Sequence, residues 1–401
     1  MQVNTILSQM SSLSAPQYKF MQALLAVLMY LPTRLNLRNL SRYLYMSEKT
    51  VSRWFAKSFD FVGFNQLALK NVTDSGHELI VAIDACFMRK SGKKTYGIDS
   101  FWNGSAGQSE KGLEFSEIAL VDVTHNTAYH LSAVQTAAND DQNDPNYTRT
   151  DQYFAHIKKE MECLRSLKIN YIVMDSFYAK KKMINGITEL KQHAVGKLRY
   201  DSALYYPFQG EQKARGRPRK YGDKVNFNDL SQLEFVCEEN GHKIYTAKVL
   251  SVTFKRIIRI VYVARTSTKT VSTALLFSTD VSLDARTILR YYKARFQIEF
   301  LFRDAKQFTG LNDHQVRDQK KLDFHLNLSL TALNLLRLQA YQHEGDLLKP
   351  KRGVISIASK KVRNFNEHML KKISSMFEID LTCIKYQDLI AHLCNYGVIA
   401  T

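Results

Sequence analysis

The chain has 401 residues, of which 56 are Lys or Arg and 38 are Asp or Glu, so its formal net charge is +18. Hydrophobic residues make up 45% and aromatic residues 11%, which excludes a disordered chain and indicates a folded protein large enough for two or more domains. The excess of positive charge points to a polyanionic partner, most often nucleic acid, although a basic protein without such a partner remains an alternative.

The five cysteines are scattered and form no Cys-x2-Cys pair, which argues against a disulfide framework or a zinc ribbon and fits a reducing compartment. The N-terminus has no basic region ahead of an apolar segment, so we expect no signal peptide. The longest apolar run, residues 20–31, is too short to span a bilayer. We therefore expect a soluble, cytoplasmic protein that has no membrane partner.

The N-terminal part is expected to be helical. A helix over residues 17–31 should be followed by two shorter helices, over 35–44 and 47–59, that are joined by a tight turn. This pair resembles a helix-turn-helix, whose second helix would project Lys49 and Arg53 into a major groove. A helical hairpin that does not bind DNA is the alternative.

The pattern then changes to that of an α/β core. A short apolar run that ends at Asp84 predicts a buried strand. A second strand over residues 95–102 should pair back on it, and a third is expected over residues 117–123. A polar loop is expected over residues 139–151 and a helix over residues 151–167. A short strand over residues 169–175 should then end in Asp175.

Residues 196–281 contain several short strand-like segments separated by polar turns, which predicts a β-rich block. This block includes the basic segment 215–220, RGRPRK, which is stiffened by one proline. Such a segment can follow a phosphate backbone or lie in a minor groove, with Arg217 and Arg219 as contacts. A solvated basic loop is the alternative.

A helix expected over residues 284–308 carries the most informative side chains. At about 100° per residue, Tyr292, Arg295, Glu299 and Lys306 share a stripe about 60° wide, and Arg303 lies close to it. Apolar residues cover the rest of the helix, so it should be embedded in a core. A carboxylate among cations on a packed helix suggests a metal ligand beside a surface that binds phosphates.

Asp84 and Asp175 would supply the partners of Glu299. If their strands are parallel neighbours, both acids lie at the same sheet edge, and the three carboxylates would form an oxygen cage for Mg²⁺. Two such ions can support phosphodiester displacement. Each acid also has an ordinary alternative, because a strand-end Asp can cap a turn and Glu299 can pair with Arg295. Asp122 competes as a ligand but should lie farther from Asp175.

The spacing Tyr-x2-Arg-x3-Glu-x6-Lys at residues 292–306 resembles the YREK signature of a group of bacterial insertion-sequence DDE transposases. Further segments resemble the same group, namely residues 83–84, 90–95, 101–102 and 173–178. The resemblance covers roughly residues 78–320. It implies an α/β fold with an RNase H-like core, in which Asp84, Asp175 and Glu299 are the catalytic and metal-binding triad.

The resemblance also implies an insertion domain that separates Asp175 from Glu299 and helps to hold the transposon end. Tyr292, Arg295 and Lys306 would contact phosphates near the cleaved end. Several relatives hold a flipped base with a Trp, whereas this chain has only Trp54 and Trp102, both outside the insertion. Aromatic side chains that could replace it by stacking are Tyr205, Tyr206 and Phe208.

We therefore expect a DNA transposase that binds terminal inverted repeats, cleaves the element ends with two Mg²⁺ (Mn²⁺ as a substitute) and joins the 3′-OH ends to target DNA. It would act as a homodimer on paired DNA ends. The alternatives are an RNase H-like nuclease or resolvase and a non-catalytic DNA-binding regulator. The expected divisions begin with an N-terminal helical DNA-binding domain over residues 1–75. The catalytic core would comprise residues 76–195 and 282–345, separated by a β-rich insertion domain over residues 196–281. A C-terminal helical region would follow over residues 346–401.

Overall fold

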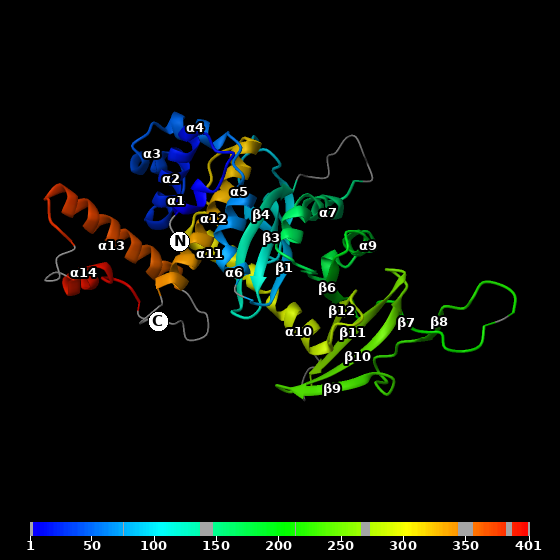
Figure 1. The fold of residues 1–401 in the computed structure, drawn as a ribbon. Helices are drawn as coiled ribbons and strands as arrows, with labels where there is room; N and C mark the ends of the chain where they lie inside the picture. Colours follow the sequence, from blue (N-terminus) through cyan, green and yellow to red (C-terminus); the bar gives the residue numbers. More distant parts are fainter. Residues whose placement is uncertain are drawn as a thin grey trace.

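The computed structural model describes residues 3–74, 76–136, 147–212, 214–265, 273–343, 356–381 and 387–399. Most of the polar loop expected over residues 139–151, and part of the C-terminal region 346–401, lie outside the described residues. Figure 1 shows a central sheet with helices packed around one end, while the other end of the sheet extends away from them.

All the described strands belong to one twelve-stranded, mostly antiparallel sheet. The order of hydrogen-bonded neighbours is β2-β3-β1-β5-β6-β12-β11-β10-β7-β8, with β4 on β3 and β9 on β10. The strands of residues 196–281 continue the sheet through the pairing of β12 with β6. The strands are β1 (Leu79–Arg89), β2 (Asp99–Asn103), β3 (Gln108–Asp122), β4 (Thr127–Thr136), β5 (Tyr171–Val173), β6 (His193–Leu198), β7 (Leu204–Pro207), β8 (Tyr221–Lys224), β9 (Glu234–Glu239), β10 (His242–Ser251), β11 (Arg256–Arg265) and β12 (Thr273–Ser278).

Most helices surround the β1–β6 end of this sheet, and α10 lies against β6, β11 and β12 (Figure 1). Among the described residues, each helix is too short or too polar to cross a membrane. They are α1 (Val3–Ser8), α2 (Ala15–Tyr30), α3 (Leu37–Leu44), α4 (Glu48–Phe55), α5 (Phe61–Ala68), α6 (Lys70–Thr73), α7 (Arg149–Lys159), α8 (Met161–Ser166), α9 (Lys181–Glu189), α10 (Ala285–Ala294), α11 (Gln297–Phe308), α12 (Gln319–His343), α13 (Ile357–Met376) and α14 (Gln387–Cys394).

The helices predicted near the N-terminus are present, with adjusted ends. Asn36 caps α3 by accepting the backbone N–H of Asn39, and Ser47 caps α4 by accepting the backbone N–H of Thr50. Helix α4 ends at Phe55, so the prediction that it continues to residue 59 is wrong.

The condition that the strands near Asp84 and Asp175 be parallel neighbours is met. Val81 and Ala82 of β1 pair in parallel with Ile172 and Val173 of β5. The prediction that Asp84 ends its strand is wrong, because β1 continues to Arg89. The continuation is possible because β3 pairs with β1 along its whole length.

The second strand does not pair back on the first as predicted. Strand β2 instead pairs antiparallel with the first part of β3. The sequence also did not indicate β4, whose free edge is bound by two asparagines of α12. Asn334 contacts both the N–H and the C=O of His130, and Asn327 does the same at Ala133. These side chains satisfy backbone groups that an edge strand leaves unpaired.

The helix expected over residues 284–308 is divided into α10 and α11. The chain tightens between them into three-residue turns, in which Phe296 N–H bonds to Lys293 C=O and Glu299 N–H bonds to the Phe296 C=O. No proline or glycine occurs there. The prediction of one continuous helix over residues 284–308 is therefore wrong, and a uniform 100° per residue does not hold across the turn.

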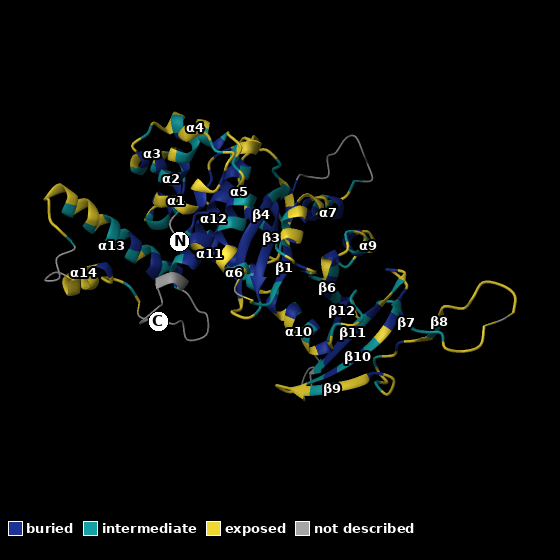
Figure 2. Ribbon diagram, viewed as in Figure 1, coloured by how far each residue is buried: buried dark blue, intermediate teal, exposed yellow. Residues whose placement is uncertain are grey.

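The two faces of the sheet have separate apolar cores, which appear dark blue in Figure 2. One face of β1, with Ile80 and Ala82, packs against α10 and α11. The other face, with Val81 and Ile83, packs against the N-terminal helices and α9. Helix α12 contributes buried apolar residues to both cores, for example Leu328 to one and Leu330 to the other.

Candidate active site

The parallel register of β1 and β5 brings Asp84 and Asp175 together. The last paired residues are Ala82 and Val173, and each acid lies two positions farther along its own chain. Side chains alternate between the two faces along a strand, so Asp84 shares its face with Ala82 and Cys86, which lie two positions away on either side. This face is the one covered by α10 and α11. Asp175 also accepts the Phe177 backbone N–H at 2.9 Å. It therefore has the expected capping role, but only one of its oxygens is used for it.

Glu299 reaches the same place from the first turn of α11. The guanidinium of Arg295 connects it to Asp84, with Nη1 3.1 Å from Asp84 Oδ2 and Nη2 3.2 Å from Glu299 Oε1. The Asp84 side chain is 19% exposed and the Glu299 side chain 43%. The cluster therefore opens to solvent on the side of Glu299.

The electrostatics of this cluster favour a bound cation. Burial raises the pKa of Asp84 to about 7; Arg295 opposes the shift, and the charges of Asp175 and Glu299 add to it. Burial alone would lower the pKa of Arg295, but Asp84, Tyr292 and Glu299 raise it. Mutually repelling carboxylates with one counter-ion form an all-oxygen donor set that suits a hard divalent ion.

The other side chains of the predicted stripe have different surroundings. Arg295 lies over the ring of Tyr292, 5.7 Å from its centroid, and Lys306 donates to the Phe87 backbone C=O at 2.9 Å. Tyr292 therefore lies beside Arg295, whereas Lys306 binds β1 three residues beyond Asp84. Arg303 points elsewhere, because it pairs with Asp304 at 2.8 Å.

A family model described as the transposase DDE domain matches residues 75–335. The match covers well over half of the chain and includes all three acids. The chain belongs to this family. No curated protein matches the chain. As a DDE transposase, the protein belongs to a family that uses divalent metal ions, which agrees with the donor set at Asp84, Asp175 and Glu299.

The competing acid of this transposase, Asp122, lies beside the first residue of β1, away from Asp84. It pairs with Leu79 at the start of β1, five residues before Asp84. At about 3.3 Å per residue the two acids are separated by about 16 Å along the strand. Asp122 is therefore not a ligand of the Asp84 cluster.

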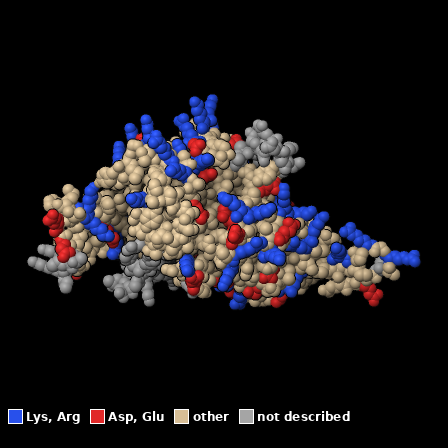
Figure 3. Space-filling model, turned by 45° about the horizontal axis from the view of Figure 1, so that its top comes forward, with Lys and Arg blue, Asp and Glu red and all other residues tan. Residues whose placement is uncertain are grey.

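The predicted DNA contacts outside the cluster are exposed. Lys49 and Arg53 lie on the surface of α4, and Arg217 and Arg219 lie in the loop between β7 and β8. That loop forms the projection at the right of Figure 1, and Lys and Arg side chains extend to its end in Figure 3. The positions of these side chains are compatible with phosphate contacts in two separate regions of the transposase.

The aromatic candidates for base stacking differ in availability. Phe208 is covered by the guanidinium of Arg219, 4.7 Å from its centroid, and Trp54 stacks on Phe20 at 4.9 Å. Tyr205 stands edge-on to Tyr221. Trp102 of β2 is 60% exposed. Of these rings, Trp102 is the one with the largest free surface.

Sequence reasoning missed a buried acid beside the cluster. Glu117 of β3 lies opposite Asp84 in the antiparallel register, and its Oε1 is 2.7 Å from His130 Nδ1. Both side chains are fully buried, and burial raises the pKa of Glu117 to about 7 although His130 opposes the shift. The available signal was an acid inside an apolar strand, but the strand was expected to begin at Glu117.

Proposed function

We propose that this protein is a cut-and-paste DNA transposase. It binds the terminal inverted repeats of its element, cleaves the phosphodiester bonds at the ends and joins the 3′-OH ends to target DNA. The observation that carries the proposal is the convergence of Asp84, Asp175 and Glu299 around Arg295. The acids come from β1, from the end of β5 and from α11, elements that pack in one core and hold their positions before DNA arrives.

The sheet topology supports an RNase H-like core. Its strands β3, β1, β5 and β6 are neighbours, and β1, β5 and β6 are parallel. We propose that residues 196–281 are an insertion on this core, since β7 to β11 extend the sheet beyond β12 (Figure 1). The core itself would comprise residues 76–195 and 282–345.

Each side chain has a distinct role in this reaction. Two Mg²⁺ or Mn²⁺ ions, held by Asp84, Asp175 and Glu299, would activate the attacking oxygen and stabilise the leaving oxygen. Arg295 neutralises Asp84 and Glu299 in the free protein and becomes available to a phosphate when those oxygens take a cation. Tyr292 supports the guanidinium from one side, and Lys306 carries positive charge to β1 beside Asp84.

We expect Arg295→Gln to separate cation binding from DNA joining. Removal of the guanidinium leaves Asp84 and Glu299 without their counter-ion, so Mg²⁺ should raise the melting temperature by more than it does in the unaltered protein. Strand joining should fall by about 10- to 100-fold, because a charged contact with the phosphate is lost. Thermal unfolding with and without Mg²⁺ and a joining assay measure the two effects.

Arg290→Gln is the matched control for this experiment. Arg290 lies on α10 and pairs with Glu78 at 2.6 Å on the surface. Its loss should leave the response to Mg²⁺ and the joining rate unchanged. Joining by Arg295→Gln at the normal rate would remove Arg295 from the proposed machinery.

We propose that α3 and α4 form a helix-turn-helix that recognises the element ends. Replacement of Lys49 and Arg53 by Gln should weaken binding to end DNA and make the slope of log affinity against log salt concentration shallower by about 2 units, because two phosphate contacts are lost. Fluorescence anisotropy at several salt concentrations measures this slope. The charge-matched control is replacement of Lys158 and Lys159, which are exposed on α7, by Gln. If both double variants gave the same slope, the assignment of Lys49 and Arg53 would be contradicted.

The two DNA ends must be held together, so we propose that a homodimer forms on paired ends. The C-terminal helices are the candidate interface, because Met376 and Phe377 at the end of α13 are each 70% exposed. Size-exclusion chromatography with light scattering, with and without end DNA, distinguishes a dimer that needs DNA from one that does not.

The experiment that tests the function uses Mg²⁺ and a plasmid that carries the DNA flanking the native gene of this protein. Excised and joined ends would support transposition. Nicks without joining would identify an RNase H-like nuclease or resolvase instead. Binding without any cleavage would indicate a DNA-binding regulator, and both of these results would contradict the proposal.

A further inference from the structure

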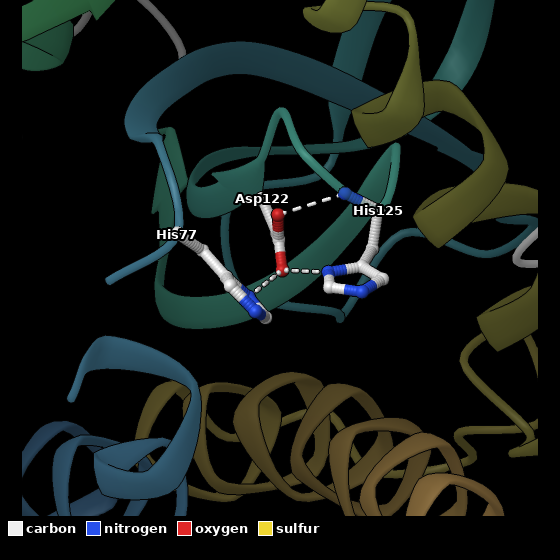
Figure 4. Close-up of side chains that lie close together, drawn as sticks. All are labelled: His77, Asp122 and His125. Carbon is white, nitrogen blue, oxygen red and sulfur yellow. Dashed lines mark hydrogen bonds and ion pairs between the residues drawn. The ribbon is translucent and has the colours of Figure 1, made fainter. Parts of the chain in front are cut away.

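A second group of possible metal ligands lies far from the acidic cluster. His77, Asp122 and His125 point toward one another in Figure 4, with ligand atoms that all lie within 4.8 Å of one another. His77 belongs to the segment between α6 and β1, Asp122 ends β3, and His125 lies in the turn before β4. The group is therefore beside the start of β1, about 16 Å from Asp84 along the strand.

The ligand atoms lie slightly closer together than a bound tetrahedral ion would hold them. Asp122 Oδ2 is 2.7 Å from His77 Nδ1 and 3.1 Å from His125 Nδ1. A tetrahedral ion with bonds of about 2.0–2.2 Å needs ligand atoms about 3.3 Å apart, so modest side-chain rotations would admit it. A cavity of about 260 Å³, lined also by Ala68 and Leu338, adjoins the three side chains and leaves room for a further ligand such as water.

The group is held in place before any ion binds. Asp122 is 2% exposed, and its Oδ1 accepts the backbone N–H of His125 at 2.9 Å. Asn126 follows with a left-handed backbone, φ 51°, which closes the turn and orients His125. The segment of His77 is fixed by the bond from Val123 N–H to the Glu78 C=O.

We propose that His77, Asp122 and His125 bind one Zn²⁺ ion, separately from the catalytic ions. Two imidazoles and one carboxylate are a donor set typical of zinc, whereas Mg²⁺ prefers oxygen ligands alone. The ion would connect the segment that leaves the N-terminal helices to the β3–β4 turn, beside residues of α5, α6 and α12. It would thus stabilise the junction between the proposed DNA-binding helices and the sheet.

The test is a titration of the full chain, without a histidine tag and after chelator treatment, with Zn²⁺ alone. Isothermal calorimetry should give about one equivalent of tight binding, and Zn²⁺ should raise the melting temperature. His77→Ala and His125→Ala should each weaken binding by roughly 100-fold or more, since loss of a direct ligand should exceed the effect of losing an outer contact. Co²⁺ should give the visible absorption of a four-coordinate ion only when all three residues are present.

His242→Ala is the matched control, because His242 lies on β10 and bonds to its own turn at Asn240. It should bind Zn²⁺ as the unaltered protein does. His125→Ala should also retain Mg²⁺-dependent DNA cleavage, so failure of the zinc site and failure of the proposed transposase function are distinguishable. Absence of saturable Zn²⁺ binding would show that the three residues form only a hydrogen-bonded network. Binding by His77→Ala and His125→Ala as tight as that of the unaltered protein would show the same.

Discussion

Asp84→Asn is expected to lower DNA cleavage by roughly 1,000-fold or more while end DNA remains bound with unchanged affinity. Asn keeps the size of the side chain but removes the negative charge that would hold a divalent ion, and metal-ion catalysis contributes several kcal/mol to such reactions. The basic surfaces of α4 and of the β7–β8 loop are untouched. Cleavage rates and anisotropy with the same DNA measure the two properties.

The same substitution should stabilise the folded protein. The pKa of Asp84 is raised to about 7 by burial, so its contribution to stability is largest below about pH 4 and is lost as the pH rises toward 7. Above pH 7, Asp84→Asn should therefore raise the free energy of unfolding by about 1–3 kcal/mol. Chemical denaturation at several pH values measures the difference, which should vanish at low pH.

Asp99→Asn is the control for both effects, because Asp99 is exposed on β2. It should change neither cleavage nor stability. Normal cleavage by Asp84→Asn would remove Asp84 from the catalytic triad. A loss of stability at neutral pH would show that the pair with Arg295 outweighs the cost of burying the carboxylate.

Arg337→Met is expected to lower the free energy of unfolding by about 3–5 kcal/mol. Arg337 of α12 is 7% exposed, pairs with Asp304 of α11 at 2.9 Å and donates to the Ala128 backbone C=O of β4. It thereby fixes the helix that carries Glu299. Its loss leaves Asp304 buried with only the exposed Arg303 as a partner. Urea denaturation measures the change.

The double variant Arg337→Met with Asp304→Leu should recover most of that loss, because an apolar pair of similar volume can replace a buried ion pair. Arg363→Met is the surface control: Arg363 and Glu367 pair on α13 with side chains about 30% exposed, and their pair should contribute less than about 1 kcal/mol. Equal effects of Arg337→Met and Arg363→Met would show that the buried pair does not fix α11.

The sequence indicated that Asp84 and Asp175 lie close together, because each follows a short apolar run typical of a buried strand. It could not predict that β1 continues past Asp84, since the continuation depends on pairing with β3, a distant segment. The same limit explains the missed β4. Its pattern is not strongly alternating, and its edge is completed by asparagines of α12, about two hundred positions away in sequence.

The helix of Glu299 shows what residue spacing can and cannot indicate. Spacing predicted that Arg295 and Glu299 share a face, and they form an ion pair. It could not predict the turn at Arg295 and Phe296, because no proline or glycine marks it. Nor could it indicate the contact of Arg295 with Asp84, which requires β1 and α11 to be packed together.

We propose that Asp84, Asp175 and Glu299 together form one metal site. The most direct measurement is anomalous diffraction from crystals of the protein grown with end DNA and Mn²⁺. If the three residues form this site, anomalous peaks should lie within bonding distance of carboxylate oxygens from all three and should be lost in Asp84→Asn. Peaks that lie elsewhere, or that persist in Asp84→Asn with full occupancy, would contradict it.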